Sequence, residues 1–276
     1  DPGNFSYDRS RWRRYVLATY GHNTVLVDGQ DQHRSGKRET YFWPRPWQGA
    51  APPANDARWA STPDYDFAAG AYTDGYGPKG DLAVTHTRRV LFLKSDNLFV
   101  LSDRLVPSDQ SDHTYEALFH LDTEDAKVGP ANAVTTQNAD QSNLTITPAA
   151  PLDVEIVKGK TEEPVQGWAS GPWRAIPTAI YRTKGKGIVR MAFVLEPVPK
   201  GAQAVVKSVE LLPGVADGLA IRLTMADGST RLVVQRDQPA GAVTVDGVTA
   251  ETEMTVVSRS AEGKVVSESR FGGKAP

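Results

Sequence analysis

The sequence predicts an all-β protein in which a large antiparallel β-sandwich is followed by a smaller β-sandwich or hairpin domain. Short runs with an apolar residue at every second position recur along the chain, which is the pattern of half-buried strands. The 24 glycines and 19 prolines are spread among these runs. Strands at short spacing with glycine turns between them are typical of an antiparallel sandwich.

The alternation places individual strands in order along the chain. We expect strands at 84–93, 98–101, 115–121, 152–156, 220–223 and 232–235. Asp-Gly and Glu-Gly turns indicate hairpins at 226–229, 245–248 and 261–264. Only residues 9–20 could form a helix, and that stretch carries no convincing cap.

Two prolines mark the best domain boundary. The stretch Glu196-Pro197-Val198-Pro199-Lys200-Gly201 breaks any ladder it enters, so we divide the chain into domains 1–198 and 199–276. Residues 41–63 form the longest irregular segment and hold three tryptophans among five prolines. A long ordered loop is more often functional than accidental.

Composition excludes several classes of protein. Lys and Arg total 31 against 33 acids, for a net charge of −2, which removes the electrostatic argument for nucleic acid as a partner. The same balance argues against bulk attraction to heavily sulfated polymers. No apolar run reaches the ~18 residues of a membrane span. The chain has no cysteine, which excludes disulfides, thiolate metal sites and cysteine nucleophiles.

Histidine is scarce, and His22 is its most suggestive member. It stands in YGHNTVLVDG, at the entrance of a buried strand that leads to an Asp-Gly turn. It could be a metal ligand or general base, or simply a hydrogen-bonded residue that caps the strand. Asp64 and Asp66 lie on one face of an extended stretch, but no carboxylate pair suits a glycoside hydrolase.

The tryptophans carry more information. Trp43 and Trp47 fall in the Pro-rich loop, where exposed aromatic rings suit the flat apolar faces of sugars. Trp59, Trp168 and Trp173 occupy similar loops. The alternative role for all five is to pin their loops in small apolar clusters, and both interpretations stay open.

Several motifs resemble the heparinase II/III family of polysaccharide lyases. They are DPGNFSYD at 1–8, WRRY at 12–15 and HNTVLVDGQ at 22–30, followed in order by YTDGYG at 72–77, HTRRVLF at 86–92, and Gly167-Trp168 with Pro177. The resemblance covers about residues 1–198. It implies the antiparallel super-β-sandwich of that family, which follows an (α/α) toroid, with the active site in the cleft between the two.

The resemblance also implies site residues. Asp1 and His22 match metal ligands of the family, and a third ligand lies in an upstream strand with a G-H-x-H motif. A zinc ion held there would have a structural role. Tyr7, the candidate catalytic residue, falls near the position of a sandwich tyrosine that reaches the substrate in alginate-type members. Because the family's toroid carries further catalytic groups, we expect this chain alone to fold but to have little lyase activity.

The implied reaction is β-elimination from a uronic-acid-containing polysaccharide. Donors must neutralise the uronate carboxylate, a base removes the C5 proton, and a phenol protonates the departing oxygen. Arg13 and Arg14 are candidates to hold carboxylates, or are ordinary surface charges. We expect a periplasmic or secreted protein whose substrate is alginate-like or unsulfated. A non-catalytic carbohydrate-binding or structural module is the alternative.

Overall fold

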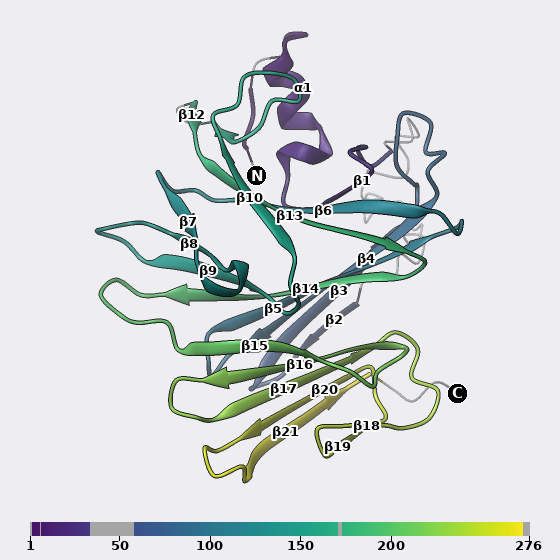
Figure 1. Cartoon of the computed structure of the whole chain (residues 1–276), viewed down its shortest axis with the longest axis vertical. Helices are drawn as coiled ribbons and strands as arrows, with labels where there is room; N and C mark the ends of the chain where they lie inside the picture. The colour runs from purple at the N-terminus through teal and green to yellow at the C-terminus, as the bar shows by residue number, and fades with distance from the viewer. Residues whose placement is uncertain (1, 6, 34–57, 171–172, 273–276) are drawn as a thin grey trace, which may run out of the picture.

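The computed structural model describes residues 2–5, 7–33, 58–170 and 173–272. Within these residues the chain forms three main antiparallel sheets, stacked one above the other in Figure 1. The four-stranded sheet has the order β1 (Val25–Val27), β6 (Asp112–His120), β13 (Pro177–Lys186) and β10 (Asp153–Lys158). The predicted all-β class and sandwich architecture are therefore confirmed.

The largest sheet occupies the middle layer. Its order is β2 (Arg58–Ser61), β3 (Tyr65–Tyr72), β4 (Val84–Leu93), β5 (Leu98–Pro107), β14 (Val189–Val198), β9 (Asn143–Pro148), β8 (Val134–Thr136) and β7 (Ala126–Val128). The short 3-10 helix η4 (Pro130–Asn132) precedes β8. β2 is a correction to the irregular segment predicted over 41–63, whose residues 41–57 lie outside the described part.

The third layer is the five-stranded sheet. Its order is β15 (Val206–Leu212), β16 (Gly218–Met225), β17 (Thr230–Arg236), β20 (Met254–Arg259) and β21 (Val265–Phe271). The hairpins β18 (Val243–Val245) with β19 (Val248–Ala250), and β11 (Trp168–Ala169) with β12 (Arg174–Ala175), complete the strands. The turns predicted at 226–229, 245–248 and 261–264 each join two paired strands.

The middle sheet is buried on both faces, and β4 shows how its sequence allows this. Val84 and Val90 point toward the four-stranded sheet, in a core that includes Tyr115 and Tyr181. Leu91 points the other way, into a second core that includes residues of the five-stranded sheet such as Val233. Because successive side chains of a strand alternate between faces, one strand supplies both cores.

The second core bears on the division at residue 198. β14 ends at Val198 and β15 begins at Val206, so the Pro-rich stretch does separate two sheets. The two sheets nevertheless bury their facing side chains in one shared cluster. Whether 199–276 behaves as a separate domain stays a prediction.

The chain before β1 contributes the helices at the top of Figure 1. Helix α1 (Arg11–Leu17) lies within the predicted 9–20 stretch and buries Tyr15 and Val16. The expectation that it lacks a cap is wrong, because Ser10 Oγ accepts the Arg13 amide at 3.2 Å. The 3-10 helix η1 (Thr19–Gly21) follows. Within the described ranges, no helix is long and apolar enough to cross a membrane.

The shared core gives a stability prediction. All six tryptophans precede residue 198, so their fluorescence reports unfolding of residues 1–198 and not of residues 199–276. Val233→Ala removes buried methyl groups from the five-stranded side of the shared core and should cost about 2 kcal/mol. We expect the tryptophan-detected urea midpoint to fall accordingly.

The matched control is Val266→Ala in β21, where the side chain is 70% exposed and little change is expected. A Val233→Ala protein whose tryptophan midpoint is unchanged while circular dichroism shows an earlier transition would mean that the two parts unfold independently.

Candidate functional site

A group of polar side chains gathers where η1 leads into β1. Asn23 is its centre: its Oδ1 accepts the backbone amide of His120 at 2.7 Å and lies 3.0 Å from His120 Nδ1. The Asn23 backbone carbonyl accepts a hydrogen bond from the guanidinium of Arg88 in β4. We call Asn23, Arg88, His120 and Gln166 the Asn23 cluster.

Gln166, just before β11, closes the cluster from the other side. Its Oε1 accepts the Gly167 amide at 2.8 Å and lies 3.0 Å from His120 Nε2, while its Nε2 donates to the Tyr20 carbonyl at 2.8 Å. Gly167 has φ +79°, and a Cβ there would lie 2.7 Å from the Val157 carbonyl oxygen. Only glycine fits, which explains the Gly-Trp pair.

His120 is held as a neutral imidazole. Burial lowers its pKa to about 4, against the opposing effect of the hydrogen bond with Gln166. A neutral ring has one N–H, so at neutral pH His120 donates to only one of the two amide oxygens beside it.

A buried ion pair anchors the cluster to the middle sheet. Asp103 of β5 is fully buried and accepts from Arg88 Nε at 2.7 Å, Arg88 Nη2 at 2.8 Å and His86 Nε2 at 2.7 Å. Burial opposes ionisation of Asp103, but the charges and hydrogen bonds of Arg88 and His86 outweigh it and lower its pKa. Arg88 thus reaches from the buried carboxylate to the Asn23 backbone.

Aromatic rings pack beside the cluster and support α1. The ring centroids of Trp12 lie 5.1 Å from those of both Trp168 and Trp173, which stack on each other at 5.8 Å. Trp168 Nε1 also donates to the Lys160 carbonyl at 3.0 Å. These contacts agree with the loop-pinning role for Trp168 and Trp173. Trp59 differs, because it lies on β2 and is 68% exposed.

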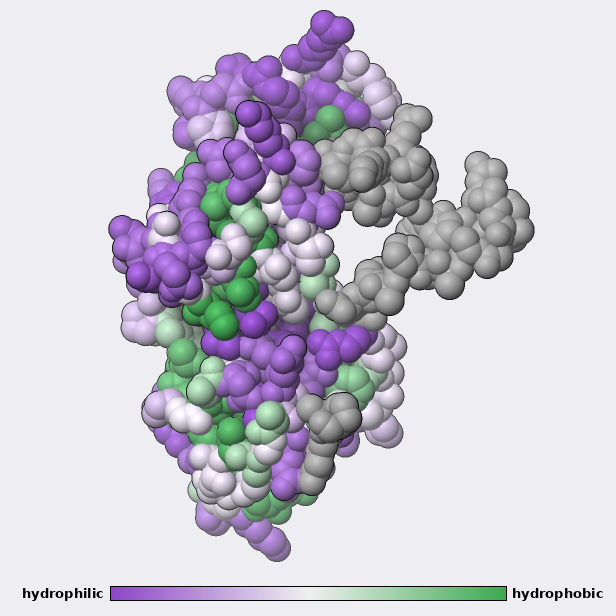
Figure 2. Space-filling model, turned by 90° about the vertical axis from the view of Figure 1, so that its right-hand side faces the viewer, coloured by the Kyte–Doolittle hydropathy of each residue, from purple (hydrophilic) through white to green (hydrophobic). Residues whose placement is uncertain are grey.

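Arg13 and Arg14 of α1 differ in their interaction partners. Arg14 pairs with Glu163 at 2.5 Å, so an acid already occupies its guanidinium. The Arg13 guanidinium lies 4.7 Å from the ring centroid of Tyr7, whose side chain is exposed, and donates to Asn4 Oδ1 at 2.9 Å. Among the described residues, the structure gives Arg13 no carboxylate partner. In Figure 2 the end of the molecule that carries α1 is mostly hydrophilic.

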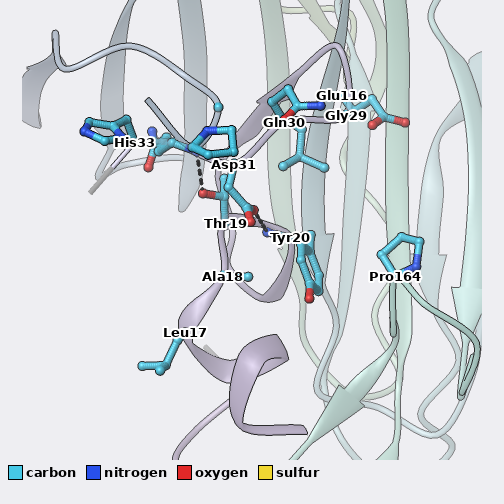
Figure 3. Close-up of a pocket in the computed structure, with 14 residues that line it drawn as sticks. Leu17, Ala18, Thr19, Tyr20, Gly29, Gln30, Asp31, His33, Glu116 and Pro164 are labelled. Carbon is cyan, nitrogen blue, oxygen red and sulfur yellow. Dashed lines mark hydrogen bonds between the residues drawn. The ribbon is translucent and has the colours of Figure 1, made fainter. Parts of the chain in front are cut away.

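A surface cavity of about 430 Å³ adjoins this region (Figure 3). Its walls are the α1–η1 segment, the turn after β1, and parts of β6 and two loops. The lining residues are Leu17, Ala18, Thr19, Tyr20, Leu26, Gly29, Gln30, Asp31, Gln32, His33, Gly77, Pro78, Glu116 and Pro164. None is Lys or Arg.

Two hydrogen bonds join the segment after β1 to η1 at the cavity wall. The Asp31 carboxylate accepts the Tyr20 amide at 3.4 Å, and the Gln32 amide donates to Thr19 Oγ1 at 2.8 Å. Burial raises the pKa of Asp31 above its ordinary value. Burial, together with the negative charge of Asp31, raises the pKa of Tyr20 to about 12. The cavity therefore has a mixed apolar and polar lining, with the Asp31 carboxylate and the Tyr20 phenol in its wall.

The structure brings some of the predicted site residues to one end of the molecule. His22 Nε2 donates to the carbonyl of Val16 in α1 at 3.2 Å, and the same helix carries Arg13 and Arg14. Tyr7 joins them through Arg13. Asp1, Trp43 and Trp47 lie outside the described residues. Within the described ranges, no group of three or more His, Asp or Glu side chains converges as a metal site would.

The sequence did not single out His120, Gln166 or Arg88 as one cluster. They come from three elements and meet Asn23 only through strand register and loop closure. The available signals were Gln166 directly before the Gly-Trp pair, and Arg88 two residues after the buried His86 in β4.

Comparison with known proteins gives a consistent family and fold. Residues 1–178 match the family described as heparinase II/III-like, C-terminal. No curated protein matches. A mutant heparan sulfate lyase HepC from Pedobacter heparinus is similar in structure, with 17% sequence identity and a TM-score of 0.63 over 87% of this chain and 35% of that one.

Two heparinase III structures are also similar. One has 17% identity and a TM-score of 0.59, covering 82% of this chain and 32% of that one. The other has 13% identity and a TM-score of 0.55, covering 80% and 30%. At these identities the likeness shows the fold, and the chain spans about a third of the length of these enzymes.

The environment of His120 gives a testable pKa. Side-chain NMR titration of the imidazole should find a pKa of about 4 in the wild type, because burial disfavours the charged form. Gln166→Glu places a carboxylate beside the ring and should raise that pKa by more than one unit.

His33→Gln, which alters a different ring at the cavity, serves as the control and should leave the His120 titration unchanged. A wild-type value near the ordinary ~6.5 would contradict the proposed burial of a neutral imidazole.

Proposed function

Because this chain belongs to the heparinase II/III-like, C-terminal family, we propose that it is the substrate-facing β-sandwich of a polysaccharide lyase. The substrate is a uronic-acid-containing polysaccharide of the alginate or glycosaminoglycan kind. One observation carries the proposal. The α1 arginines, Tyr7, the Asn23 cluster and the cavity all lie at the same end of the molecule.

The reaction proposed is β-elimination. A base removes the C5 proton of the uronate, the C5–H electrons form the C4=C5 double bond, and the C4–O4 bond breaks. The departing oxygen then takes a proton from an acid. Donors to the uronate carboxylate lower the barrier, because negative charge builds up there as the C5 proton leaves.

Of the two candidate arginines, Arg13 suits the carboxylate better than Arg14. Its guanidinium is a rigid fork of N–H donors, and among the described residues no acid neutralises it. Arg14 is less suited, since Glu163 already occupies it. Tyr7 beside Arg13 is the proposed phenolic acid or base, and its exposure leaves it accessible to a substrate. Trp43 and Trp47 remain proposed stacking residues.

The proposal includes a divalent metal. Histidine and carboxylate donors suit zinc. His22 hydrogen bonds to the Val16 carbonyl through Nε2, and metal-binding histidines are commonly oriented by such a bond from the second ring nitrogen. The proposed second ligand is Asp1, with a third from an upstream strand. When bound, the ion would cross-link the segments that border the cleft.

The proposed catalytic partner is an upstream (α/α) toroid domain, which would form the other wall of the cleft. Because such polysaccharides lie outside the cytoplasm, the proposal includes a periplasmic or secreted location. The alternative is a non-catalytic carbohydrate-binding or structural β-sandwich module.

One experiment tests the proposal and the role of Arg13. The full-length protein containing this chain is mixed with a panel of uronate polymers, and unsaturated uronate is followed by ultraviolet absorbance beside binding by calorimetry. We expect Arg13→Ala to weaken binding of the preferred oligosaccharide about tenfold or more, the loss of one charge-assisted contact.

Arg14→Ala is the matched control on the same helix and should weaken binding less than about threefold, because Glu163 already occupies its guanidinium. Glycan binding without elimination on any polymer would favour the module, and equal losses in the two variants would remove Arg13 from the site.

A further inference from the structure

His113 lies between two carboxylates that belong to two different turns. Its Nδ1 is 2.7 Å from Oδ2 of Asp28, after β1, and its Nε2 is 2.9 Å from Oδ1 of Asp109, between β5 and β6. The His113 side chain is only 5% exposed. Ionised carboxylates accept hydrogen bonds and do not donate them, so both contacts require hydrogen on both ring nitrogens. The geometry is that of an imidazolium.

Asp28 is the first central residue of a tight turn. Asp28 and Gly29 have φ values of 51° and 67°, and the Gln30 amide donates back to the Val27 carbonyl at 2.8 Å. The Asp28 carboxylate uses Oδ1 to accept the Thr114 amide at 2.7 Å and Oδ2 for His113. Strand β6 therefore holds this turn through both oxygens.

The same turn builds the cavity. Gly29, Gln30 and Asp31 follow Asp28 directly and line the cavity, as does Glu116, three residues after His113 in β6 (Figure 3). His113 itself does not line it. A shift of the Asp28 turn would therefore move one wall of the cavity relative to Tyr20.

We propose that His113, as an imidazolium, is a positioning residue that fixes the Asp28 turn and makes the cavity wall respond to pH. The proposal rests on the proposed function only in taking the cavity as part of the site. When His113 loses a proton, the neutral ring can donate to only one carboxylate. One of the two turns is then released, and a ring lone pair faces its oxygen.

The groups around His113 favour its charged form. The hydrogen bond to Asp28 raises the pKa of His113, aided by the hydrogen bond to Asp109 and opposed by burial. Tyr115, whose ring centroid is 6.3 Å away, stays neutral because burial raises its pKa to about 12. On β13, Gly185 stands opposite His113, and the neighbouring Lys184 lies 3.8 Å from Asp112.

The sign of the pH effect follows from the raised pKa. The stabilisation is complete below the unfolded-state value of about 6.5 and is lost as pH rises through the higher folded-state value. The wall should thus be fixed in mildly acidic solution and looser in alkaline solution.

The test uses NMR on the glycan-free protein from about pH 5 to 9, the range over which histidines with raised pKa values titrate. The backbone amides of Gly29 and Gln30 should shift with a midpoint above 6.5, together with the His113 ring. Asp109→Asn removes one carboxylate and should lower that midpoint, and His113→Gln should abolish the step.

His33→Gln is the control, because His33 itself lines the cavity. The proposal is overturned if the step disappears in His33→Gln, or if Asp109→Asn leaves the midpoint unchanged. The Asp109 variant decides the matter even if His113→Gln does not fold. Since no glycan is present, a failed lyase assay would leave this result unaffected.

Discussion

The buried carboxylate of Asp103 is the constraint on which the rest of the site depends. A lone charge in the core between two sheets would be too costly, so Asp103 requires both His86 and the guanidinium fork of Arg88. Arg88 then has one amino group left, and it donates to the Asn23 backbone. A requirement of the core thereby helps to position the segment between η1 and β1, the edge strand of the four-stranded sheet.

From Asn23, further hydrogen bonds link the remaining polar groups one after another. Asn23 binds the end of β6 through His120, and His120 meets Gln166, which binds the carbonyl of Tyr20. Each bond ties a different segment to the same end of the sandwich. The same end carries two chemically distinct surfaces, the arginines of α1 and the cavity beside Tyr20.

The sequence predicted what local pattern controls. Strand β4 was placed at 84–93 with its observed bounds, because its side chains alternate between two cores. The hairpin turns were placed by their glycines. Strand β2 was missed because the prolines before it dominate the segment, and the Ser10 cap was missed because no acidic residue follows it in the first turn.

The site was harder to predict because it is made by long-range contacts. Asn23 and His120 are 97 residues apart, and His120 and Gln166 are 46 apart. Motif resemblance singled out His22 and Tyr7, and guanidinium chemistry suggested Arg13 and Arg14. Periodicity, however, gives no information on which side chains bond across sheets. His113 shows the same limit, since its partner Asp28 is 85 residues away.

The most direct test of this account is hydrogen exchange at the backbone amide of His120, which donates to Asn23. Arg88→Lys keeps a positive charge for Asp103 but loses the fork that also reaches the Asn23 carbonyl. The account predicts that this variant exchanges the His120 amide about tenfold faster, a loss of about 1.4 kcal/mol in local protection, while the Val233 amide is unchanged. Arg89→Lys, which alters the opposite face of β4, should leave His120 as in the wild type. An unchanged His120 amide in Arg88→Lys, or equal acceleration at His120 and Val233, would contradict the claim that Asp103 and Arg88 position the site.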